Sequence, residues 1–268
     1  MTASRKQLLV LAALLGTFAL LAFLTYAVGP LRESLFRTAS GTTLPLPLAR
    51  VSYLQAAAWN ATIVFAFYGL MGLLGVWLAG RIGIPGVFRP GAGPRSLLLW
   101  PVVIGLSAGG AAVLLDFLLT RGHGVWVGFP HPEFPLSLVA SVTAAVGEEV
   151  LFRMVVMALA AWLWVFVARA RHIPKHELRP ARTTGLWIGN VVAAVAFGAM
   201  HLPTVMVLLG TTRLAGVPTV ALVELFAVNG IIGLAAGERY ARDGLVAAAG
   251  VHFWANMFWH VAWPLMGG

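Results

Sequence analysis

Seven long apolar stretches, separated by short polar segments, make up most of the 268-residue chain. They lie at 7–28, 54–80, 96–120, 135–168, 184–209, 217–237 and 244–264. A transmembrane helix needs about 20 apolar residues, so each stretch is long enough to cross a bilayer. The fourth stretch is longer than one crossing requires and forms either one long tilted helix or an interfacial segment followed by a span. The pattern therefore predicts an all-α polytopic helical membrane protein with about seven or eight transmembrane helices.

The composition supports the same fold class. Hydrophobic residues make up 60% of the chain and charged residues 10%, whereas soluble domains carry about 25% charged residues. The chain has no cysteine, which excludes disulfides, thiol catalysis and cysteine-bound zinc. The first apolar stretch follows a basic start but is too long for the core of a signal peptide, so we expect it to be retained as a span.

The basic residues predict how the chain is oriented. Most of the charge of +9 lies in the short connections rather than on a soluble face, so we expect no nucleic-acid partner. With the N-terminus in the cytoplasm, twelve Lys and Arg residues fall on that side and five on the other, as the positive-inside rule requires. We therefore expect a protein embedded in the lipid of a prokaryotic plasma membrane, with a cytoplasmic N-terminus.

Three charged residues interrupt the fourth apolar stretch. In the segment AAVGEEVLFRMVVM they are Glu148, Glu149 and Arg153. A charge near the bilayer centre costs at least about 2.5 kcal/mol, so such residues are usually paired or functional. On a helix, Glu149 and Arg153 are four residues apart and can form an ion pair, whereas Glu148 faces about 140° away from Arg153. We therefore predict that Arg153 holds Glu149 and that Glu148 points into a cavity, where it can act as a base.

Later stretches supply partners for such a base. His201 lies in the apolar segment VAAVAFGAMHLPT, while His252 and Asn256 lie four residues apart on one helix face. A carboxylate and a histidine from separate helices can activate a water molecule. Imidazole and carboxamide donors can hold the oxyanion of a tetrahedral intermediate. Together with Glu148, these residues suffice for amide hydrolysis without a covalent nucleophile.

Three motifs in this order resemble those of the CPBP family, which comprises CAAX-type prenyl-protein endopeptidases and the bacteriocin-processing or immunity proteins also called Abi. They are E-E-x-x-x-R at 148–153, F-x-x-x-H at 197–201 and H-x-x-x-N at 252–256. The resemblance covers about residues 135–260, whereas residues 1–130 carry no recognised motif. We expect one membrane domain over 1–268, with the catalytic core at 135–260.

The resemblance implies an intramembrane endopeptidase acting on a membrane-bound or lipidated protein or peptide. The process is CAAX-type processing, peptide maturation or immunity. In the family, the first glutamate and the F-x-x-x-H histidine activate water, and the last histidine and asparagine form the oxyanion hole. Carried over to this chain, these catalytic residues are Glu148, His201, His252 and Asn256, with Glu149 and Arg153 supporting them.

Several alternatives stay open. A proton-coupled transporter would use the same acids and histidines as a proton relay, and a non-catalytic scaffold or immunity protein would keep them for stability. The family has also been described as metal-dependent. Two histidines and a carboxylate suit zinc, so Glu148, His201 and His252 form an alternative ligand set, although we expect no cofactor. The segment GLSAG resembles the serine motif of rhomboid proteases and makes Ser107 an alternative nucleophile.

Some residues have structural explanations. For His260, two turns beyond His252, we expect a place at the membrane interface. Small residues let membrane helices approach closely. The glycines for which we expect such contacts are Gly105, Gly109, Gly110, Gly233 and Gly237.

Overall fold

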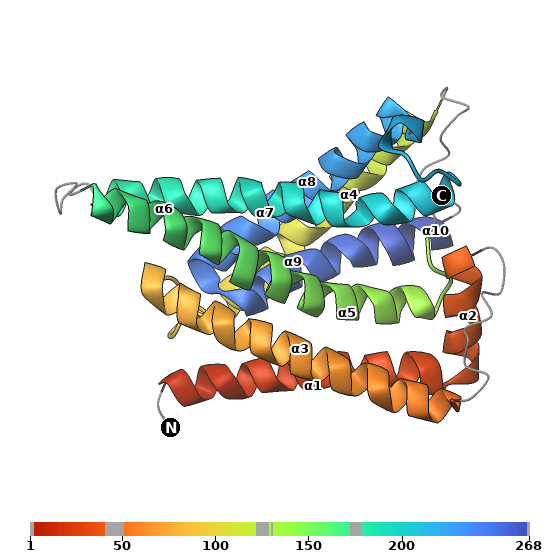
Figure 1. Cartoon of the computed structure of the whole chain (residues 1–268), viewed down its shortest axis with the longest axis horizontal. Helices are drawn as coiled ribbons and strands as arrows, with labels where there is room; N and C mark the ends of the chain where they lie inside the picture. Colours follow the sequence, from red (N-terminus) through yellow and green to blue (C-terminus); the bar gives the residue numbers. More distant parts are fainter. Residues whose placement is uncertain (1–2, 41–50, 122–128, 130, 172–177, 267–268) are drawn as a thin grey trace.

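The chain folds into a bundle of long helices (Figure 1). A computed structural model describes residues 3–40, 51–121, 129, 131–171 and 178–266, and every regular element in these ranges is helical. The all-α fold predicted from the sequence is confirmed. The elements in chain order are α1 (Ala3–Ala27), α2 (Gly29–Ser40), α3 (Tyr53–Ile82), η1 (Arg95–Leu99), α4 (Trp100–Thr120), α5 (Leu136–Glu149), η2 (Val150–Met157), α6 (Ala158–Ala170), α7 (Leu178–Leu208), η4 (Leu214–Gly216), α8 (Thr219–Asp243), α9 (Leu245–Asn256), η5 (Met257–Ala262) and α10 (Trp263–Leu265).

Six helices in the described part of the chain are long and apolar enough to cross a membrane, so this is an integral membrane protein. The predicted polytopic fold is confirmed, and the predicted count of seven or eight is approximate. The last apolar stretch forms α9, η5 and α10, which run the length of the bundle (Figure 1) without being among the six. His252, Asn256 and His260 lower the hydropathy of this last helix below that of the other stretches.

The fourth apolar stretch is one continuous helix rather than two elements. It runs over Leu136–Ala170, 35 residues, through α5, η2 and α6. Its middle part, η2, is π-helical and begins directly after Glu149. Such π-helical turns are rare and frequently occur at functional sites. The charged residues of this stretch therefore lie where the helix changes its winding.

A single buried apolar cluster joins the N-terminal helices to the rest of the bundle. It includes Leu11 of α1, Leu78 of α3, Met154 of η2 and Val251 of α9. Helix α2 lies across one end of the bundle, roughly perpendicular to α1 and α3 (Figure 1). Helix α2 is not among the spans predicted from the sequence, because the segment GPLRESLFRTAS is too short and too polar to cross a membrane.

Helix α4 approaches α9 through two glycines. A Cβ atom added to Gly105 would lie 2.5 Å from the carbonyl oxygen of Val251, and one added to Gly109 would lie 2.7 Å from that of Ala255. These carbonyls immediately precede His252 and Asn256 in the sequence. The glycines therefore fix the position of the helix that carries both polar residues.

The other glycine predictions have mixed outcomes. Gly233 packs against Ala194, and Gly237 lies against the side chain of Asn190, so both contacts between α7 and α8 are confirmed. The prediction for Gly110 is wrong, because no atom of a neighbouring element in the described part of the chain lies within 4 Å of a Cβ built there. Gly110 is next to Gly109 on the same helix but faces away from α9.

Replacing Gly109 by alanine is expected to destabilise the protein, because the new methyl group meets the backbone of α9. Overpacking of this kind costs about 1–3 kcal/mol. Gly110→Ala is the matched control, since its methyl group enters open space. Thermal unfolding midpoints in detergent should fall for Gly109→Ala and not for Gly110→Ala. Equal midpoints would contradict a close contact between α4 and α9.

Candidate active site

The ion pair predicted within the fourth apolar stretch is present. Arg153 Nε lies 3.2 Å from Glu149 Oε2, and both side chains are fully buried. The Arg153 guanidinium also lies 5.5 Å from the centroid of the Phe197 ring, within reach of a cation–π interaction. Phe197 belongs to α7, so the pair connects the long central helix to the helix that carries His201.

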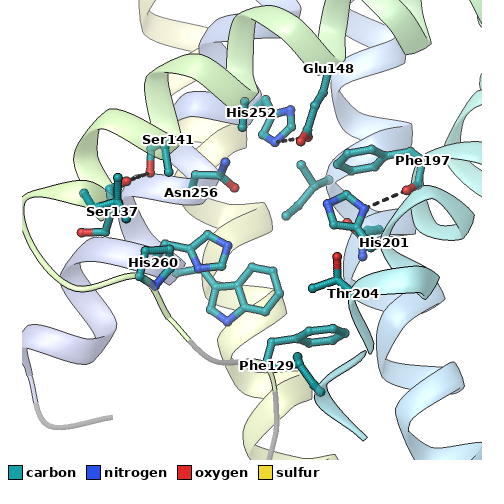
Figure 2. A pocket seen from close by; sticks show the side chains of 18 of the residues that line it. Phe129, Ser137, Ser141, Glu148, Phe197, His201, Thr204, His252, Asn256 and His260 are labelled. Carbon is teal, nitrogen blue, oxygen red and sulfur yellow. Dashed lines mark hydrogen bonds and ion pairs between the residues drawn. The ribbon is translucent and has the colours of Figure 1, made fainter. Parts of the chain in front are cut away.

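His252 of α9 contacts both glutamates. Its Nδ1–H donates to Glu149 Oε1 at 2.9 Å, because a carboxylate can only accept. Its Nε2 lies 3.6 Å from Glu148 Oε2 (Figure 2). Glu149 therefore contacts Arg153 through one oxygen and fixes the His252 ring through the other. The contact between Glu149 and His252 is not predicted by any spacing in the sequence.

Glu148 faces a cavity, as its helical spacing from Arg153 predicted. Its side chain is 21% exposed, whereas that of Glu149 is fully buried. The two adjacent carboxylates thus differ in environment. Glu149 is enclosed between Arg153 and His252, and Glu148 is accessible from the cavity.

His201 faces Glu148 and His252 across the cavity (Figure 2). Its Nδ1–H donates to the backbone oxygen of Phe197 at 2.9 Å. A carbonyl oxygen can only accept, so the proton of the neutral ring is on Nδ1. Nε2 is consequently left as a lone-pair acceptor on the part of the ring that faces the cavity.

Asn256 lies one turn after His252 on α9 and lines the same cavity. Its side chain is buried, with 6% of the residue exposed. Within the described residues its amide makes no hydrogen bond, and Figure 2 shows it directed between His252 and His260. The Asn256 Nδ2 donor is therefore available to a bound molecule.

The cavity that these residues share has a volume of about 600 Å³ and is mostly apolar. It lies between α5, α7, α8 and α9, with Leu35 of α2 also on its wall.

Small residues of α5 line the cavity at helical spacing before Glu148, among them Ala140 and Ala144. The Ser141 hydroxyl, which also lines it, donates to the backbone oxygen of Ser137 at 2.7 Å. Glu148, His201, His252 and Asn256 thus converge on one space, although they come from three helices.

A second histidine pair was not predicted. His131 Nδ1 and His260 Nδ1 are 3.0 Å apart, and both rings pack against Trp259. Burial lowers the pKa of His131 from its usual 6.5, although the charge of Asp116 acts in the opposite direction. His260 lines the cavity, and its place at the membrane interface stays a prediction. Its spacing of four residues from Asn256 was the signal that pointed to this face.

The two alternative chemistries gain no support from the geometry. Ser107 donates to the backbone oxygen of Val103 on an exposed face of α4 and does not line the cavity. Among the residues that the structure describes, no three His, Asp or Glu side chains are placed to hold a metal ion. Glu148, His201 and His252 are thus not grouped as a ligand set in the described residues, and zinc stays an alternative drawn from the sequence.

Residues 130–258 match the family model described as Type II CAAX prenyl endopeptidase Rce1-like. This match confirms the resemblance predicted from the three motifs, all of which lie within the matched residues. It supports a CAAX-type intramembrane protease at the level of the family. Searches among curated proteins and among solved structures give no match.

Replacing Arg153 by methionine is expected to destabilise the fold strongly, because it leaves Glu149 charged and buried. Breaking one side of a buried ion pair costs about 3–5 kcal/mol. The double variant Glu149→Gln, Arg153→Met removes both charges and should recover part of this loss. Unfolding midpoints of the purified proteins in detergent measure both effects. A single variant as stable as wild type would show that the pair is dispensable.

Proposed function

We propose that this chain, whose residues 130–258 match the Rce1-like CAAX prenyl endopeptidase model, cleaves a peptide bond within the membrane. The substrate is a membrane-bound or lipidated protein or peptide. One observation carries the proposal: Glu148, His201, His252 and Asn256 line a single cavity. They comprise a base, an acceptor for water and two donors for an oxyanion, which is the set that amide hydrolysis requires.

Glu148 and His201 activate the attacking water. The Glu148 carboxylate takes one proton from the water, and His201 Nε2 accepts a hydrogen bond from its other hydrogen. His201 can do so because its own proton is held on Nδ1 by the Phe197 carbonyl. The hydroxide that forms attacks the carbonyl carbon of the scissile bond.

His252 and Asn256 stabilise the negative oxygen of the tetrahedral intermediate. As an imidazolium, His252 donates from Nδ1 to Glu149 and from Nε2 to the oxyanion, while Asn256 donates from Nδ2. The proton held by Glu148 then passes to the leaving amide nitrogen, and the C–N bond breaks. The products are a free carboxyl group and a free amine, and Glu148 returns to its ionised state.

The membrane setting suits a substrate with an apolar anchor. The walls of the cavity are mostly apolar, so burial of a lipid chain or an apolar peptide segment there is favourable. The N-terminus, the end of α6 and the start of α9 lie at one end of the bundle, and the C-terminus lies at the other (Figure 1). We assign the first end to the cytoplasm, because the basic connections predicted there follow the positive-inside rule. A prokaryotic plasma membrane is the proposed location.

Glu148→Gln is expected to abolish cleavage while the protein still folds. Loss of a general base lowers rates by about 10²–10⁴-fold. Glu238→Gln is the control, because Glu238 pairs with Arg242 outside the cavity and its replacement should leave cleavage intact. The assay is cleavage of a farnesylated CAAX peptide by protein in lipid nanodiscs. Retained cleavage by Glu148→Gln would remove Glu148 as the base, and proton-driven solute flux without cleavage by wild type would favour a transporter.

Asn256→Ala is expected to lower kcat by about 10²–10³-fold, the usual effect of removing one oxyanion donor. KM should change less, because the interaction forms mainly in the transition state. Ser107→Ala should have full activity, since Ser107 lies outside the cavity. Steady-state kinetics with the same peptide measures both variants. An inactive Ser107→Ala protein that folds normally would favour a serine nucleophile instead.

A further inference from the structure

The wall of the cavity contains a polar residue to which the proposed chemistry gives no role. Asn229 of α8 lines the cavity, and 7% of the residue is exposed. Its Nδ2 donates to the backbone oxygen of Leu225 at 2.7 Å, one turn earlier on the same helix. A polar side chain in an apolar wall is unfavourable unless both ends of its amide are satisfied, and only one end is satisfied within the described residues.

The contact with Leu225 fixes which end of the amide remains. The Leu225 oxygen can only accept, so the atom that contacts it is the nitrogen of the Asn229 amide. Oδ1 is therefore the end without a partner in the described part of the chain. The cavity thus has a neutral acceptor on α8, in addition to the Asn256 donor on α9.

The packing of α8 near Asn229, together with the lining of the cavity, shows where this acceptor faces. Leu225 packs in one cluster with Val205 of α7. Val228 packs in another cluster with Ala255 of α9. Asn229 follows Leu225 by one turn on α8 and lines the same cavity as His201 of α7 and Asn256 of α9, so it faces the space between those two helices.

We propose that Asn229 Oδ1 accepts a hydrogen bond from a backbone N–H of the bound peptide and sets the register of that peptide relative to Glu148. A peptide that enters an apolar cavity loses the hydrogen bonds of its N–H groups to water, and an unmatched N–H is costly. In the proposed chemistry His252 and Asn256 donate to the substrate carbonyl and Glu148 binds the water. None of them therefore accepts a hydrogen bond from the peptide N–H. The inference rests on the proposed endopeptidase function and adds a specificity rule: the peptide needs an N–H at one position near the scissile bond.

The test uses the farnesylated CAAX peptide and a series of analogues. In each analogue one backbone amide near the scissile bond, but not the scissile bond itself, is replaced by an ester that lacks the N–H. Wild-type protein in nanodiscs should lose about three- to tenfold in kcat/KM at one ester position and little at the others. Asn229→Ala should show that loss already with the parent peptide and no further loss with the same ester, as in a double-mutant cycle.

Asn190→Ala is the control variant. Asn190 is also a buried asparagine whose Nδ2 donates to a backbone oxygen, that of Leu234 at 3.0 Å, but it lies outside the cavity. It should respond to the ester as wild type does. The proposal is overturned if no single ester position selectively lowers kcat/KM of the wild-type protein. This outcome is measured on wild type alone and does not depend on the folding of any variant. It is also overturned if Asn229→Ala remains as sensitive to the ester as wild type.

Failure of the proposed function would look different. If wild type does not cleave the parent peptide, the endopeptidase assignment fails, and the Asn229 proposal is decided by binding alone. Fluorescence anisotropy of the labelled parent and ester peptides then gives their affinities for wild type and for Asn229→Ala. The subsite is supported if one ester position lowers the affinity for wild type but not for Asn229→Ala. It is overturned if wild type binds the parent and ester peptides equally, or binds neither.

Discussion

The buried ion pair between Glu149 and Arg153 is the constraint on which the arrangement of the site depends. Neither charge is tolerable alone inside a bilayer, so each fixes the other on consecutive turns of the long central helix. The pair then extends to three further helices. Arg153 reaches the Phe197 ring of α7 and fits beside Gly233 of α8, where a Cβ atom would lie 3.1 Å from its guanidinium. Glu149 reaches His252 of α9.

The winding of two helices changes at the residues of the site. The π-helical segment η2 begins directly after Glu149, and η5 begins directly after Asn256. In an α-helix, side chains four residues apart share a face, and a π-helical turn shifts the face on which the following residues lie. Along the central helix, Ser141 and Glu148 line the cavity before η2 begins, whereas along the last helix the lining continues into η5 with Trp259 and His260. Met154 and Met157 of η2 are fully buried in the apolar cluster.

The sequence predicted those features that depend on positions within one helix. The spacing of Glu149 and Arg153 predicted their ion pair, and the position of Glu148 predicted that it faces a cavity. Contacts between distant segments could not be found in this way. His252 and Glu149 are 103 residues apart, and no local pattern indicates which of two adjacent glutamates a distant imidazole will contact. Helix α2 was not predicted, because hydropathy detects membrane spans and not short amphipathic helices. Asn229 was not predicted either, because a single asparagine among apolar residues belongs to no pattern.

The backbone of each helix decides what its polar side chain offers to the cavity. Histidine and asparagine can both donate and accept, so the residue type alone does not define a role. His201 and Asn229 each donate to the carbonyl oxygen four residues earlier on their own helix, at 2.9 and 2.7 Å. Each therefore presents an acceptor. Asn256 makes no such contact in the described residues and keeps its donor free, while His252 is oriented by a carboxylate rather than by a carbonyl. In the mostly apolar cavity, few other groups compete for these side chains. The local hydrogen bonds therefore leave His201 and Asn229 as acceptors, one for water and one for a peptide N–H. His252 and Asn256 are left as donors to an oxyanion.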